Sequence, residues 1–129
     1  MKVENEVTKT KVTPEEINDL IIDAVQDIKA KNVVKLDLRK LDDAPTDFFI
    51  ICTGESNVQV RSIASNVRTR LKDELQTLPK TLEGTTESRW VLVDYFWTVV
   101  HVFHPESREF YELEELWSDA IVTKYDDVV

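Results

Sequence analysis

Two segments of the chain carry apolar residues at steps of three and four, the spacing that predicts amphipathic helices. The first covers residues 13–31, where Thr13 can cap the helix, Pro14 takes the first helical position and Glu16 completes a capping box. The second covers residues 53–78, the length of a helix of about five turns. Each predicted helix has one apolar face that must be buried against the rest of the fold.

Shorter apolar runs predict the strands of a sheet. Residues 33–41 form one run, and residues 48–53, FFIICT, are apolar throughout, as expected for a strand at the centre of a sheet. A short strand is expected near residues 80–84, followed by a hairpin over residues 89–104 and a short helix within residues 104–122. The predicted fold class is α/β (α+β), with one mixed sheet of about five strands, two main helices and a short C-terminal helix.

The length of 129 residues suits one domain. Residues 1–12 lack a periodic apolar pattern and are expected to form a mobile tail, residues 13–120 the domain, and residues 121–129 a C-terminal tail. The N-terminal segment lacks the apolar stretch of a secretory signal, and no apolar run reaches the length of a membrane span. A cytoplasmic location is therefore expected.

The net charge of −9, from 16 Lys and Arg against 25 Asp and Glu, narrows the expected partners. An acidic surface repels the phosphate backbone that supplies most of the affinity for nucleic acids, so direct binding to DNA or RNA is disfavoured. The same field attracts a basic protein. Cys52 is the single cysteine and lies in an apolar strand, where we expect a buried, unreactive thiol.

The turn around Gly54–Ser56 joins a predicted strand to a predicted helix, the place where a phosphate-binding loop would also lie. The chain has only two glycines and lacks the Lys-Ser/Thr pair of a Walker loop, so the phosphate interpretation is weak. A capping box explains the residues more simply: the Ser56 hydroxyl would accept from the Gln59 amide N–H while the Gln59 side chain reaches back to Ser56. An anion at the helix N-terminus remains the alternative.

Candidate catalytic and metal-binding groups are few. His101 and His104 are three residues apart on a predicted strand, so they face opposite ways and are not expected to share a metal ion. Asp94 and His101 are expected on one face, but no serine or cysteine nucleophile accompanies them. No cofactor is expected.

The predicted hairpin RWVLVDYFWTVVHVFH carries large apolar groups on both faces. With the turn at Phe96 and Trp97, antiparallel pairing places the valine-rich positions on one face, which would pack against the helices. The other face pairs Trp90 with Phe103, Leu92 with His101 and Asp94 with Val99.

This second face has two interpretations. A tryptophan surrounded by polar groups is typical of a protein-binding hot spot. Alternatively, the C-terminal helix, with Leu113, Leu116 and Trp117, covers the face as part of the core. The pattern alone does not distinguish them.

The segments DFFIICTGESNVQV, WVLVD and VVHVFHPESREFYELEELW, in their order and spacing, resemble the ribosomal silencing factor family, also known as RsfS or Iojap. The resemblance runs from about Thr13 to Trp117. It implies an α/β fold related to nucleotidyltransferases but without known enzymatic activity. It also implies binding to the large ribosomal subunit through the ribosomal protein numbered fourteen. There the protein would block association with the small subunit and repress translation when nutrients are short.

The resemblance assigns the docking strand to Trp90 and Leu92, with Asp94, His101 and Phe103 on the same face. In the C-terminal signature it adds Tyr111, Leu113 and Trp117, as partner contacts or core residues. The family usually has a Gly-Asp type hairpin turn, whereas this chain has Phe96-Trp97, whose exposure would be costly. These aromatics would pack under the tail, extend the contact or join a homodimer. An alternative function is a nucleotidyltransferase-like enzyme that binds nucleotide at the Gly54–Ser56 turn, although no Asp-x-Asp metal pair follows it.

Overall fold

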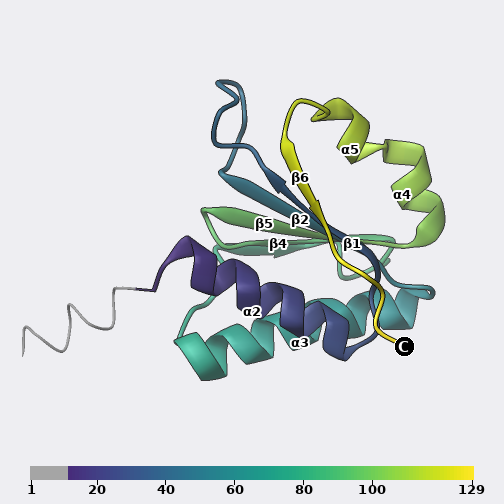
Figure 1. Ribbon diagram of the computed structural model, residues 1–129. Helices are drawn as coiled ribbons and strands as arrows, with labels where there is room; N and C mark the ends of the chain where they lie inside the picture. The colour runs from purple at the N-terminus through teal and green to yellow at the C-terminus, as the bar shows by residue number, and fades with distance from the viewer. Residues whose placement is uncertain (1–11) are drawn as a thin grey trace, which may run out of the picture.

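A six-stranded mixed sheet in the order β3-β4-β5-β2-β1-β6 organises the computed structural model, which describes residues 12–129 (Figure 1). The expected tail of residues 1–12 falls almost wholly outside the described residues. The strands are β1 Lys31–Asp37, β2 Phe48–Thr53, β3 Thr81–Glu83, β4 Trp90–Asp94, β5 Thr98–Phe103 and β6 Ile121–Lys124. The helices are α2 Pro14–Asp27, α3 Asn57–Leu75, α4 Pro105–Tyr111 and α5 Leu113–Leu116. The predicted mixed α/β architecture is confirmed, with one strand more than expected.

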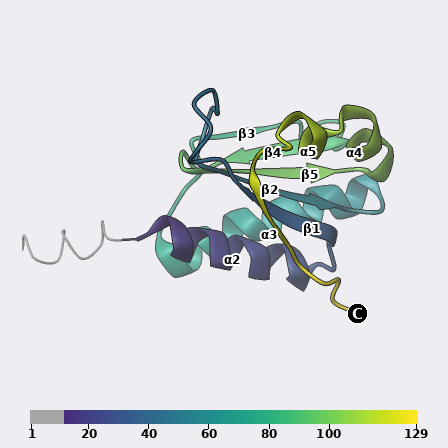
Figure 2. The ribbon, with the colours of Figure 1, turned by 45° about the horizontal axis from the view of Figure 1, so that its top comes forward.

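The two long helices lie side by side on one face of the sheet, and the two short helices lie on the other (Figure 2). Helix α2 begins with the predicted capping box between Thr13 and Glu16. Helix α3 ends at Leu75 because Gln76 takes a left-handed conformation (φ 51°). The prediction that the helix continues to Leu78 is therefore wrong, and Leu78 is exposed.

The hairpin of β4 and β5 has the predicted register, with Trp90 opposite Phe103 and Leu92 opposite His101. Its valine-rich face is buried against α2 and α3, as expected. Beside β5, strand β2 runs parallel and contributes six buried residues, which confirms its central position. The face opposite the long helices carries a second, smaller cluster of buried side chains.

The prediction of a tail for residues 121–129 is wrong. Ile121–Lys124 pair antiparallel with β1 as strand β6. Beyond this strand the backbone N–H of Tyr125 donates to the carbonyl oxygen of Val33 (3.0 Å), and the Asp127 carboxylate accepts from the N–H of Asn32 (2.9 Å). The C-terminal segment therefore forms one edge of the sheet.

Candidate partner-binding site

Trp90 begins strand β4 and lies at the centre of a group of aromatic rings on the sheet face opposite α2 and α3. Its indole stacks on Phe103 with 5.0 Å between ring centroids, and Tyr111 of α4 lies against it at 4.6 Å. Its Nε1 donates a 3.0 Å hydrogen bond to Nδ1 of His101. Three neighbours thus hold the ring, while the residue as a whole is half-buried.

His101 supports the tryptophan from beneath. An indole N–H only donates, so Nδ1 of His101 must accept, and the neutral imidazole carries its proton on Nε2. The side chain is 4% exposed, and this burial lowers the pKa of His101 to about 3. Nε2 is buried without a hydrogen-bond partner among the described residues, while the Phe49 ring meets the imidazole edge-on at 4.5 Å. His101 is therefore a neutral part of the core at physiological pH.

The structure brings all eight residues of the predicted site to this face, at different depths. Trp90, Leu92 and Asp94 are half-buried, and Tyr111 is 50% exposed. Phe103 has no exposed area, so in this structure it supports the indole from below. The eight residues are the predicted set: Trp90, Leu92, Asp94, His101, Phe103, Tyr111, Leu113 and Trp117.

The covering interpretation holds for one part of the face. Leu113 and Trp117 pack against the smaller core cluster, and the Trp117 ring meets Phe49 at 6.2 Å. Leu116, which the covering interpretation included, is exposed instead. The C-terminal helices thus cover the face around Phe49 and leave Trp90 and Leu92 partly open.

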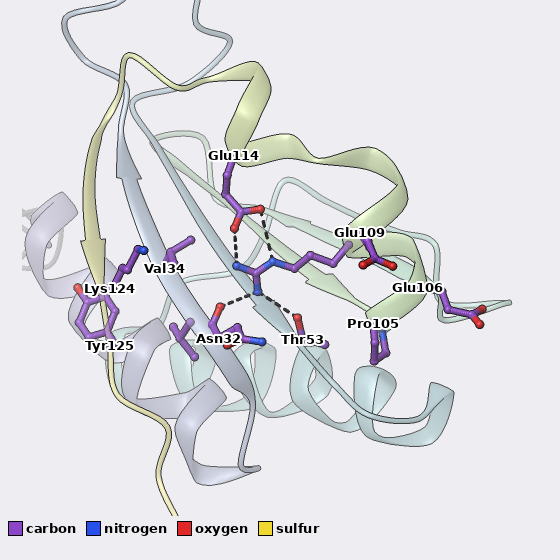
Figure 3. Close-up of a pocket in the computed structure, with 11 residues that line it drawn as sticks. Asn32, Val34, Thr53, Pro105, Glu106, Glu109, Glu114, Lys124 and Tyr125 are labelled. Carbon is purple, nitrogen blue, oxygen red and sulfur yellow. Dashed lines mark hydrogen bonds and ion pairs between the residues drawn. The ribbon is translucent and has the colours of Figure 1, made fainter.

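Arg108 fixes these helices to the sheet, a role that the sequence did not suggest. Its guanidinium donates to the Glu114 carboxylate (2.6 Å), to the carbonyl oxygen of Asn32 and to the Thr53 hydroxyl (3.0 Å). Figure 3 shows these three partners, Glu114, Asn32 and Thr53, around the guanidinium group, with Lys124 on the opposite wall of the pocket. The Arg108 side chain is only 13% exposed, so its charge must be paired.

Figure 3 also shows that the pocket beside Arg108 carries charges of both signs. Glu106, Glu109 and Glu114 contribute carboxylates, against the two cations Arg108 and Lys124. Because the guanidinium is already held by Glu114 and Asn32, the pocket offers no free arginine for an anionic ligand.

The Gly54–Ser56 turn forms a helix cap in which several amide groups have partners within the chain. The Gly54 N–H donates to the Phe103 carbonyl oxygen (2.9 Å), and the Ser56 hydroxyl accepts from the Gln59 N–H (3.0 Å), as predicted. The second half of the predicted box is wrong: Gln59 Oε1 accepts from the N–H of Glu55 (2.7 Å), and its amide nitrogen donates to the Ile28 carbonyl oxygen. A side chain on Gly54 would also meet the backbone of Val60 at 2.9 Å. The N–H groups of Gly54 and Glu55, which a phosphate-binding loop would direct at its ligand, thus already have acceptors within the chain.

His104 and Cys52, the other candidate functional groups, also have structural environments. The His104 side chain caps α4, accepting from the Glu106 N–H at 3.4 Å. Within residues 12–129 no three His, Cys, Asp or Glu side chains come together as metal ligands would, and no helix is long and apolar enough to cross a membrane. Cys52 is fully buried, as expected, and burial raises the pKa of its thiol to about 12.

Comparisons with known proteins agree on one family. The family model described as "Ribosomal silencing factor during starvation" matches residues 11–129. The Ribosomal silencing factor RsfS of Halalkalibacterium halodurans is 40% identical over 115 residues, covering 89% of this chain and 97% of that protein. Its counterpart from Bacillus subtilis is 41% identical over 103 residues, covering 80% and 86%.

A solved structure supports the same assignment. The crystal structure of a Chromobacterium violaceum protein superposes with a TM-score of 0.79 at 38% identity, covering 83% of this chain and 88% of that one. The fold, the family match over residues 11–129 and these relatives place the chain in the ribosomal silencing factor family.

Proposed function

We propose that the protein represses translation by occupying a surface of the large ribosomal subunit that must be free for joining to the small subunit. The partner on that surface is the ribosomal protein numbered fourteen, as the family resemblance implies. The protein acts by steric occlusion, with neither enzymatic chemistry nor a cofactor. The observation that carries the site assignment is the half-buried indole of Trp90, which contacts His101, Phe103 and Tyr111.

The surroundings of this indole suit a binding hot spot. Aromatic anchors contribute most when they are already ordered, because binding then costs little side-chain entropy. The hydrogen bond from Trp90 to His101 and the stack on Phe103 provide that order. Leu92 and Tyr111 enlarge the apolar contact, and Asp94 supplies a charged rim.

The charge of the protein favours such a partner. A net charge of −9 attracts a basic ribosomal protein and speeds the encounter. It also repels exposed ribosomal RNA, which limits binding elsewhere on the subunit. An interface of roughly 800 Å² per partner would be ordinary for a stable protein complex.

Co-sedimentation with purified large subunits tests the proposal. Trp90→Ala is expected to abolish co-sedimentation while the far-ultraviolet circular dichroism of the protein is retained. Val58→Ala is the matched control, because Val58 is an exposed apolar residue of α3, on the other side of the sheet. A folded Trp90→Ala protein that still sediments with the subunits would reject the site.

Direct measurement of subunit joining tests the mechanism separately. The wild-type protein should lower the yield of joined ribosomes from purified subunits in proportion to its occupancy. If it binds the large subunit fully without lowering that yield, the occlusion mechanism is wrong even though the site is right.

A further inference from the structure

The tip of the β4–β5 hairpin contains a bulky residue in a conformation that favours glycine. Phe96 has φ +74°, and the N–H of Trp97 donates to the carbonyl oxygen of Tyr95 at 2.9 Å. A hydrogen bond across two residues around a positive φ is the γ-turn of the rarer, strained kind. A phenylalanine there is strained whatever the space around it.

Surrounding groups hold this turn in place. The Asp94 carboxylate accepts from the N–H of Phe96 at 2.8 Å. The carbonyl oxygen of Phe96 accepts from the Thr46 hydroxyl at 2.6 Å, and that of Trp97 accepts from the N–H of Phe48 at 2.9 Å. The tip is therefore tied to the loop before β2, and the strained conformation is imposed by its neighbours.

The Phe96 side chain makes little packing contact with its own chain. The Phe96 side chain is 61% exposed, and the Lys80 ammonium lies 5.4 Å from its ring centroid. Strain that persists at an exposed, over-determined position is typical of functional sites. An exposed aromatic ring also carries a solvation cost that a partner would remove.

The position of Phe96 joins it to the proposed docking surface. It lines a pocket together with Leu92, Asp94 and His101, and Phe49 and Val99 contribute apolar walls. Phe96 is two residues beyond Asp94 and four beyond Leu92, whose side chains line the same pocket. From Trp90 to Phe96 the surface extends on the order of 20 Å at the rise of a strand, a span that suits a polypeptide better than a small molecule.

We propose that Phe96 is a second anchor of this docking surface, in contact with the same polypeptide partner that binds Trp90. The partner lays an apolar side chain into the pocket between Phe96 and Leu92. Burial of the exposed Phe96 ring would add apolar contact to an interface of about 800 Å². This inference rests on the proposed function, since it takes its occupant from that proposal.

The substitution Phe96→Gly tests the inference through two effects of opposite sign. Glycine removes the strain at φ +74°, so the melting temperature should rise by a few degrees. Loss of the ring should weaken binding to large subunits ten-fold or more, measured as Kd by sedimentation titration. Val58→Ser, an exposed apolar residue beyond the sheet, is the control and should leave the Kd unchanged.

The outcomes separate the two proposals. Loss of binding in Trp90→Ala with an unchanged Kd in Phe96→Gly would overturn the second anchor and leave the proposed function intact. A melting temperature that fails to rise would overturn the strain on which the inference depends. Analytical ultracentrifugation of the free protein completes the test. If the wild-type protein is a dimer that Phe96→Gly dissociates, and the Kd for large subunits is unchanged, the occupant of the pocket is a second copy of the chain. The proposal is then wrong.

Discussion

The indole Nε1 of Trp90 and the Nδ1 of His101 are joined by a 3.0 Å hydrogen bond between neighbouring strands of the hairpin. The two residues are diagonal neighbours in the register, since Trp90 pairs with Phe103 and His101 pairs with Leu92. This bond orients the half-buried indole of Trp90 and selects the tautomer of the buried histidine. The hydrogen bond therefore links the proposed docking surface to the buried side chains beneath it, so that a change in one affects the other.

The first prediction concerns the tautomer of His101. At pH 7 its imidazole should be neutral with the proton on Nε2, because Trp90 occupies Nδ1. Long-range ¹H–¹⁵N correlation spectra of the imidazole report this directly. Trp90→Phe, which keeps an aromatic ring but removes the N–H, should introduce the second tautomer. A wild-type spectrum with the proton on Nδ1 would contradict the hydrogen bond.

A second prediction follows from the depressed pKa of His101, about 3 in the fold, against an ordinary value near 6.5. Between these values the unfolded chain binds a proton that the folded chain does not, so stability falls as the pH drops below about 6.5. At pH 5 the loss should be about 2 kcal/mol relative to pH 8. Urea unfolding at the two pH values measures it.

The control for this pH dependence is His101→Gln, which keeps a hydrogen-bond acceptor and does not titrate. Its stability should change less between pH 8 and pH 5 than that of the wild type. Equal changes in both proteins would assign the effect to the carboxylates and contradict a buried neutral histidine.

The hairpin register could be predicted from the sequence because the side-chain period of a strand is two. Once Val91 and Val93 face the helices, Trp90 and Leu92 must face the other way. The same rule predicted the positions of Asp94 and His101. Local patterns of this kind require no knowledge of which segments meet in space.

Features that depend on distant contacts were missed. Strand β6 has four residues, all exposed, and exists because its backbone pairs with β1. The predicted C-terminal helix is divided into α4 and α5 at Glu112, which has φ 45°. No glycine in the sequence marks this break. The role of Arg108 requires Asn32, Thr53 and Glu114 to come together from three segments. Composition and periodicity do not indicate which distant segments of the chain come into contact.

A third prediction tests the role of Arg108 in positioning α4 and α5. Arg108→Met leaves Glu114 half-buried without its cation and removes the bonds to Asn32 and Thr53. Because Glu114 stays partly solvated, losing this pair together with the bonds to Asn32 and Thr53 should cost about 1–3 kcal/mol in the free energy of unfolding. The indole ¹H–¹⁵N resonance of Trp90 should also shift, because Tyr111 on α4 lies against that ring.

Two further variants separate the effect of the Arg108 side-chain geometry from the effect of its charge. Arg108→Lys keeps the charge but lacks the planar fork, so it should recover only part of the stability. Arg89→Met is the matched control for stability, because Arg89 forms an ion pair with Glu106 that is exposed on both sides, and it should cost less than about 1 kcal/mol. An unshifted Trp90 resonance in Arg108→Met would contradict the positioning role.

The last prediction concerns strand β6 and uses the alternation of an antiparallel ladder. The N–H of Tyr125 donates to Val33, so at steps of two the N–H of Thr123 also points toward β1, whereas that of Val122 points away. Thr123→Pro removes a ladder bond and should lower the free energy of unfolding by about 1–3 kcal/mol. Val122→Pro removes a donor that the ladder does not use and should cost less. Chemical denaturation of the two variants measures the difference, and equal losses would show that β6 does not have this register.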